Sequence, residues 1–203
     1  MPATPIIEYL YSAHSAYAYL GAWELERIAK AAGAQVQHRP FDFMPVMDAA
    51  GGRRFKDRTQ AHVDYFVGRE MVRWAEWRGL PMIRHRPTFH DNPLHLANGM
   101  IIASGADAAA LSQAILQAHW RDDADIADRA TLNAIAQAVE LDGSALLLAA
   151  ETDAVQTQHN ANTQEAIARN VFGSPTYFVG GDMFYGQDRL DMVARALDKP
   201  FAA

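Results

Sequence analysis

The chain has 203 residues, of which 50% are hydrophobic and 21% charged, and its formal net charge is −6. At roughly 150 residues per domain, this length favours one core domain that carries an insertion, and the apolar share argues against a disordered chain. The 18 basic residues are scattered, which argues against the broad positive surface of a nucleic-acid-binding protein.

The sequence contains no cysteine. This excludes disulfides, thiolate metal sites and a sulfur nucleophile of the protein's own, and with them a dithiol oxidoreductase. The first residues lack the basic segment of a secretory signal, and no segment approaches the roughly 20 apolar residues of a membrane-spanning helix. We therefore expect a cytoplasmic protein with no membrane partner.

The first 40 residues predict a β-α-β unit. Residues 6–11 are rich in β-branched and aromatic side chains, which favours a strand. From Ala16 onward, apolar residues recur at helical spacing until Gly33 supplies a stop. A short alternating segment around residues 36–38 then predicts a second strand, which Pro40 ends.

The middle of the chain has helical patterns throughout. One helix carries an apolar stripe that ends near Gly79, and its Trp74 and Trp77 are expected in the core because burial explains their spacing. The last helix of this region is expected to bend around residues 160–163. Further helices are predicted at residues 94–104, at 108–119, after the N-cap candidate Asp128, and at 145–170.

The C-terminal part predicts a proline, a hairpin and a closing helix, in that order. Pro175 precedes the alternating run 176–179, where it suits the first position of a strand, and its peptide bond could be cis at a cost of only about 0.5–1 kcal/mol. Gly180-Gly181 supplies the turn to a second strand at 182–185. Beyond Gly186 the apolar spacing becomes helical.

These elements together predict an α/β protein with a thioredoxin-like fold and a large all-helical insertion. Residues 1–45 and 165–203 are expected to form the thioredoxin-like domain, and residues 46–164 the helical insertion domain. In such sheets the reactive crevice lies beyond the carboxyl ends of the parallel strands. Here that place is the turn before the first helix, and we expect the loop before Pro175 to face it.

Ser15 stands at the start of the first helix. Serine is a favoured N-cap, and capping alone would explain it. The N-terminus of a helix also stabilises a thiolate or another anion. The neighbouring His14 could be a base, but adjacent residues on an extended turn usually point apart, so we give this role little weight.

No metal site is expected from the histidines. His85, His90 and His95 recur at five-residue steps across two prolines, a spacing that matches neither a helical face nor a compact ligand motif.

Several segments resemble one known family. Residues 11–20 resemble the Ser-Pro-aromatic-small-Tyr-Leu signature of the 2-hydroxychromene-2-carboxylate isomerases, relatives of kappa-class glutathione transferases with a DsbA-like thioredoxin fold. Residues 172–176 and 183–190 are similar to that family's cis-proline loop and glutathione-binding tail. The resemblance covers essentially the whole chain and departs from the family at Ala16, where the family has proline.

The resemblance implies glutathione as cofactor and assigns roles to particular residues. Ser15 matches the catalytic serine that orients the glutathione thiol. A second group, in the loop and tail, would bind the rest of the cofactor, with Gln187 and Asp188 on its γ-glutamyl end: Ser174, Pro175, Tyr185, Gly186, Gln187 and Asp188. Asp48, Lys56 and Arg58 lie where the family's substrate pocket begins, and a cation there suits a substrate carboxylate, although a solvated surface charge is the simpler explanation of Lys56.

The function that the resemblance implies is a glutathione-dependent isomerase of an aromatic-degradation intermediate, working by thiolate addition, bond rotation and elimination. Its partner would be a small aromatic carboxylate, and a homodimer is expected. Two alternatives stay open. One is a kappa-like glutathione transferase, and the other is a non-catalytic thioredoxin-like protein that binds glutathione.

Overall fold

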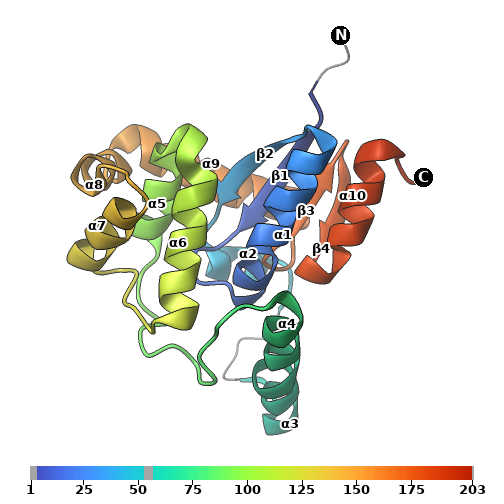
Figure 1. Cartoon of the computed structure of the whole chain (residues 1–203), viewed down its shortest axis with the longest axis horizontal. Helices are drawn as coiled ribbons and strands as arrows, with labels where there is room; N and C mark the ends of the chain where they lie inside the picture. The colour runs from blue at the N-terminus through green and yellow to red at the C-terminus, as the bar shows by residue number, and fades with distance from the viewer. Residues whose placement is uncertain (1–3, 53–56, 203) are drawn as a thin grey trace.

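The computed structural model describes residues 4–52 and 57–202. At its centre lies a four-stranded sheet of order β2-β1-β3-β4 (Figure 1). β1 pairs in parallel with β2 and antiparallel with β3, and β3 pairs antiparallel with β4. The strands are β1 (Ile6–Tyr11), β2 (Gln35–Pro40), β3 (Thr176–Val179) and β4 (Asp182–Tyr185). The predicted strands and the α/β thioredoxin-like class are confirmed.

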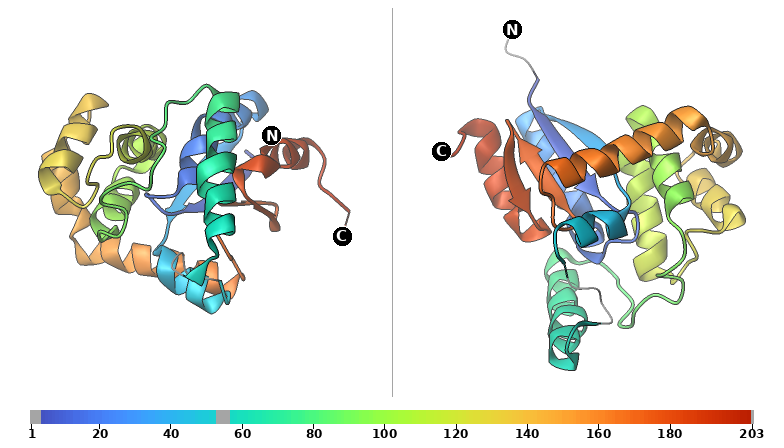
Figure 2. Two further views of the ribbon diagram at one scale, coloured as in Figure 1. Left: turned by 90° about the horizontal axis from the view of Figure 1, so that it is seen from below. Right: turned by 180° about the vertical axis from the view of Figure 1, so that it is seen from behind.

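Helices cover both faces of the sheet because β1 buries side chains on both. On one face the rings of Tyr9 and Tyr11 stack with centroids 4.0 Å apart, within the core cluster that includes α1 (Ala16–Ala32) and α10 (Leu190–Asp198). On the other face Leu10 packs in a smaller cluster with residues of α2 (Phe43–Ala49) and α9 (Asp153–Ala168). Figure 2 shows α9 crossing that second face.

Apart from α2 and α9, the helical region between β2 and β3 has two parts (Figure 1). The helices α5 to α8 pack beside the sheet, and the helical rod from α3 to α4 projects beyond it. The elements are α3 (Gln60–Val63), the π-helical η2 (Asp64–Glu70), α4 (Met71–Arg78), α5 (His95–Ala103), the short 3-10 helix η3 (Gly105–Asp107), α6 (Ala108–Arg121), α7 (Arg129–Ala138) and α8 (Gly143–Ala150); a last 3-10 turn, η4 (Gln187–Arg189), precedes α10.

Helix α9 runs through the expected domain boundary between residues 164 and 165, so the division into two domains stays a prediction. Within the described residues, no single helix is long and apolar enough to cross a membrane; α5 together with η3 and α6 meets that criterion only as a pair, bent by 114°.

The predicted bend at residues 160–163 is wrong. The helix breaks earlier, at residues 151–152, where the Oγ1 of the N-cap Thr152 accepts the N–H of Val155 at 3.4 Å. Asn162 and Thr163 are buried within the continuous α9, where their polar atoms bond the chain that leaves β2. The amide of Asn162 donates to the carbonyl of Pro40 at 3.0 Å, and Thr163 Oγ1 accepts the N–H of Asp42 at 3.0 Å. Tertiary hydrogen bonds therefore explain these polar residues.

The tryptophan stripe on α4 is only half in the core. Trp74 is partly buried and its Nε1–H donates to Glu70 at 3.2 Å, whereas Trp77 is 80% exposed, so the expectation that both are core residues is wrong for Trp77. The rod that carries them projects beyond the sheet, and Trp77 lies on the side of α4 that faces solvent.

Candidate active site

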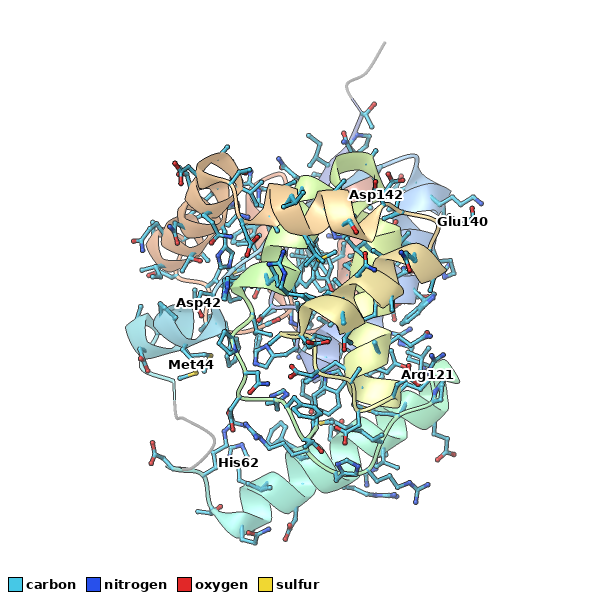
Figure 3. The ribbon with its side chains drawn as sticks, turned by 90° about the vertical axis from the view of Figure 1, so that its left-hand side faces the viewer. Asp42, Met44, His62, Arg121, Glu140 and Asp142 are labelled. Carbon is cyan, nitrogen blue, oxygen red and sulfur yellow. The ribbon has the colours of Figure 1, made fainter. Side chains whose placement is uncertain are left out.

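A pocket of about 1060 Å³ opens beyond the carboxyl ends of β1 and β2. Its walls come from the β1–α1 turn, the segment after β2, the helical rod from α3 to α4, the loop that leads into α5, α5 itself and the loop before β3. Figure 3 labels Asp42 and Met44, on the α2 side, and His62, on α3 across from them; all three line the pocket. Ligand pockets commonly measure roughly 300–1,000 Å³, so this one has room for more than one small molecule.

Ser15 caps α1 and lines this pocket. Its Oγ accepts the N–H of Ala18 at 3.2 Å and donates to the carbonyl oxygen of Ser174 at 3.0 Å. The capping role weighed from the sequence is thus confirmed, while the pocket exposes the same hydroxyl to a ligand. Because α1 has 17 residues and its first turn carries no acidic side chain, the positive end of its dipole is open to an anion here.

The loop before β3 faces Ser15, as the sequence predicts. The Ser174-Pro175 peptide bond is cis, and the buried Ser174 accepts the N–H of Ser12 on its Oγ at 3.1 Å. The carbonyl of Pro175 accepts the N–H of Gly186 at 2.9 Å, which ties the tail segment to this loop. Ser15 and Ser174, which are 159 positions apart in the sequence, are therefore direct neighbours in the structure.

Some residues of the tail motif line the pocket, and others are buried in the core. Tyr185 lines the pocket, and Gly186 turns the chain at φ 98° into η4. Asp188 is exposed beside Gly186. Gln187 is 1% exposed, packs against Gly21 of α1 and accepts a hydrogen bond from Arg78 at 3.2 Å on its Oε1. Of the two side chains expected at the γ-glutamyl end, only that of Asp188 is accessible.

Of the three residues expected to bind the substrate, only Arg58 is found at the pocket among the described residues. Arg58 lines the pocket, and its Nε is buried without a hydrogen-bond partner in the described part of the chain. Burial raises the pKa of the pocket residues Tyr17 and Tyr185, and the charge of nearby Arg58 opposes both shifts. Asp48 is exposed on α2 and is not a lining residue. Lys56 lies outside the described residues.

Three histidines whose association the sequence did not reveal, His14, His90 and His119, form a cluster at the pocket. His14 and His90 line it, with ring centroids 4.5 Å apart. Buried His119 lies behind His90, with its Nε2 2.9 Å from His90 Nδ1. The Oγ of Ser12 lies 2.8 Å from His14 Nδ1, and His14 lines the same pocket as Ser15.

These histidines are neutral near neutral pH. Burial, assisted by repulsion from His119, lowers the pKa of His14 to about 3. Burial also lowers the pKa of His90 to about 2 and depresses that of His119. In the ranges 4–52 and 57–202, no group of three or more histidine or carboxylate side chains is placed to hold a metal ion. The cluster therefore offers neutral imidazoles to a ligand.

Asn98, on α5, joins three elements of the pocket wall. It is fully buried, its Oδ1 accepts the N–H of Ala13 at 3.2 Å, and its Nδ2 donates to the carbonyl of Phe41 at 3.2 Å. Nδ2 also lies 3.1 Å from Nε2 of His159 on α9. One amide thus fixes the turns that follow β1 and β2. The only sequence signal was a polar residue inside an apolar helix, and it was overlooked.

The histidine cluster predicts a loss of stability in mild acid. Unfolded histidines titrate near pH 6.5. The folded pKa values of about 3 for His14 and about 2 for His90 lie below that, so the unfolded chain binds more protons as the pH falls through 6.5. We expect the free energy of unfolding to fall by up to about 1.4 kcal/mol per pH unit for each histidine.

Urea unfolding between about pH 7 and pH 5, above the range in which carboxylates titrate, measures this slope. A His14→Phe variant removes one of these groups and should show the smaller slope. Equal slopes for the wild type and His14→Phe would contradict the prediction.

The fold and the site together define a thioredoxin-like protein that presents a serine at the position of the helix N-terminus. The family model described as the DSBA-like thioredoxin domain matches residues 6–198, so the chain belongs to this family.

Within the family, the chain is similar to 2-hydroxychromene-2-carboxylate isomerases. That of Sphingobium xenophagum is 28% identical over 191 residues, which cover 94% of this chain and 96% of the relative. That of Pseudomonas putida is 26% identical over 196 residues, covering 96% of this chain and 95% of the relative. A solved 2-hydroxychromene-2-carboxylate isomerase structure matches with a TM-score of 0.83 at 26% identity, covering 96% of this chain and 95% of that one. These similarities confirm the resemblance found in the sequence motifs.

Proposed function

We propose that this protein is a glutathione-dependent isomerase of 2-hydroxychromene-2-carboxylate or a related intermediate of aromatic degradation. The observation that carries the proposal is the Ser15 hydroxyl, which lines the pocket at the N-terminus of α1 and bonds the Ser174 carbonyl at 3.0 Å. The names of the relatives, at 26% and 28% identity over nearly the full chain, support the reaction class.

The residues of the pocket fit a thiol cofactor with a peptide backbone. The chain has no cysteine, so a reaction that needs a thiol must borrow it. Ser15 and the positive end of α1 favour a thiolate over a thiol. The main chain of Ser174, just before β3, would pair with the cysteinyl part of glutathione as an added strand does. Exposed Asp188 would hold the γ-glutamyl ammonium, while Gln187 supports the tail from the core.

When bound, glutathione would supply a thiolate that adds to the conjugated double bond of the substrate, permits rotation about the resulting single bond and leaves again. Ser15 would donate a hydrogen bond from its hydroxyl to that sulfur in place of the one to the Ser174 carbonyl, and so would favour the anionic form of the nucleophile. The guanidinium of Arg58, which lines the pocket and whose Nε is buried without a partner among the described residues, would bind the substrate carboxylate. We also propose that the protein forms a homodimer and acts in the cytoplasm.

The test is the ultraviolet spectrum of 2-hydroxychromene-2-carboxylate mixed with the protein and a catalytic amount of glutathione. We expect the conversion to proceed through many turnovers with the glutathione concentration unchanged. Glutathione consumed in proportion to product would indicate a transferase instead. A rate no faster than the spontaneous one, with no glutathione binding by calorimetry, would exclude both enzymes.

A further inference from the structure

The histidine cluster has no role in the thiol chemistry, yet it faces the same pocket as Ser15. His14 and His90 are lining residues, and His119 contacts His90 from behind. The main chain carbonyl of His14 accepts the indole N–H of Trp120 at 2.8 Å, and the rings of His90 and Trp120 meet edge to face with centroids 5.5 Å apart. The cluster is thus held rigidly against the pocket.

The hydrogen bonds of the cluster fix which nitrogen of each ring carries the proton. His119 Nδ1 lies 3.3 Å from the carbonyl oxygen of Ala124, which can only accept, so Nδ1 is the protonated nitrogen. Nε2 of the neutral His119 is then an acceptor, and His90 Nδ1, at 2.9 Å, must donate to it. His90 consequently keeps a lone pair on Nε2, for which the described residues provide no hydrogen-bond partner.

A substrate of the proposed class needs a base of this kind. 2-Hydroxychromene-2-carboxylate is a cyclic hemiketal whose ring holds the double bond in the cis geometry. The ring must therefore open to a ketone and a phenol before thiolate addition and rotation can give the trans isomer. Ring opening moves one proton from the hemiketal hydroxyl to the ring oxygen. Ser15 is committed to the thiol, and Arg58 is cationic, so neither supplies the base.

We propose that His90 is a catalytic acid–base residue for this ring opening, an inference that rests on the proposed function. Its Nε2 takes the proton of the hemiketal hydroxyl as the carbonyl forms and the ring C–O bond breaks. The same nitrogen then gives that proton to the phenolate oxygen, so no net proton is consumed. His119 is a positioning residue that keeps the lone pair of His90 on Nε2.

The charge of the ligands suits this role. The pKa of His90 is low in the ligand-free pocket because of burial and the neighbouring His14. The carboxylate of a bound substrate and the thiolate held at Ser15 place two anions in the same pocket, and both raise the basicity of a neighbouring imidazole. His90 is therefore a stronger base when the substrate and the thiolate are bound than in the ligand-free pocket. Among the described residues, the other charged groups that act on the cluster include the paired Arg86 and Asp91, at 2.5 Å, and Asp123 and Asp125 near His119.

The first test needs no glutathione. In its absence, the wild-type protein should accelerate the exchange between the closed hemiketal and the open cis form, measured by NMR magnetisation transfer. His90→Gln should remove about 99% or more of this acceleration, since general acid–base catalysis commonly contributes about 100- to 10,000-fold. Replacement of the exposed His85, which does not line the pocket, is the matched control and should change nothing.

The second test uses glutathione and a substrate that cannot close. The methyl ether of the open cis enone still requires isomerisation but no ring opening. His90→Gln should lower kcat on the hemiketal about 100-fold or more and leave kcat on the methyl ether unchanged. His119→Phe, which removes the acceptor nitrogen, should lower kcat on the hemiketal with an unchanged KM and alter the imidazole ¹⁵N shifts of His90.

Two outcomes overturn the proposal. One is a His90→Gln variant that opens the ring as fast as the wild type, and the other is an equal loss on both substrates, which indicates a structural role. Failure of the proposed function looks different: the wild-type protein with glutathione would then isomerise neither substrate. Thermal unfolding of each variant shows whether it is folded.

Discussion

Replacing Ser15 by alanine is expected to lower kcat of the glutathione-dependent isomerisation about 100- to 1,000-fold, the usual cost of removing one hydrogen-bond donor from a developing or bound anion. The substitution takes away the hydroxyl that lines the pocket and bonds Ser174. The ultraviolet absorbance of bound glutathione at varied pH should show the thiol pKa rising in the variant, since the thiolate loses its donor.

The same substitution removes the N-cap of α1, at a cost of about 0.5–2 kcal/mol in stability. Asp128→Ala is the matched control, because Asp128 caps α7 by accepting the N–H of Thr131 at 2.8 Å and does not line the pocket. It should lose similar stability and keep full activity. A Ser15→Ala variant as active as the wild type would disprove the assigned role of the serine.

Replacing Asn98 by alanine is expected to lower the free energy of unfolding by about 2–4 kcal/mol, because it leaves two buried main-chain groups without partners. These are the N–H of Ala13 and the carbonyl of Phe41, which stand at the ends of two neighbouring strands. Because Ala13 directly precedes His14 and Ser15, we also expect weaker glutathione binding. Urea unfolding and calorimetry measure the two effects.

Two variants sharpen this test. Asn98→Asp keeps an acceptor for the N–H of Ala13 but buries a charge and cannot donate to Phe41, so it should be at least as unstable as the alanine variant. Asn160→Ala, on the exposed side of α9, should change stability by no more than about 0.5 kcal/mol. A loss for Asn98→Ala as small as that would refute the bridging role.

Local signals account for the parts of the fold that the sequence predicts correctly. The strand at Ile6–Tyr11, the stop of α1 at Gly33 and the hairpin turn at Gly180-Gly181 each depend on neighbouring residues alone. The sequence predictions are wrong where contacts between residues far apart in the chain determine the local structure. Asn162 looks like a helix breaker until its bond to Pro40 is known, and Trp77 looks like a core residue until α4 is seen to project from the body.

The residues of the candidate site also fall into those that local sequence predicts and those that depend on distant contacts. Ser15 and Ser174 are predictable because each lies at a recognisable junction, a helix start and a strand start. His90 and His119 belong to segments 29 residues apart, and only packing brings them together. The inward turn of Gln187 is equally invisible in the sequence, because it depends on the close approach of Gly21.

The pairing of β1 with β3 determines when in folding the pocket first exists. The β1-α1-β2 and β3-β4-α10 units each form from nearby residues, but Ser15 and Ser174 are 159 positions apart. Contacts of such high sequence separation are slow to form because a long loop must close first. During synthesis, Ser15 therefore emerges long before its partner, and a nascent chain has no binding site. Ligands that touch both walls stabilise only the completed fold, and the last strands to be made are the ones that create the site.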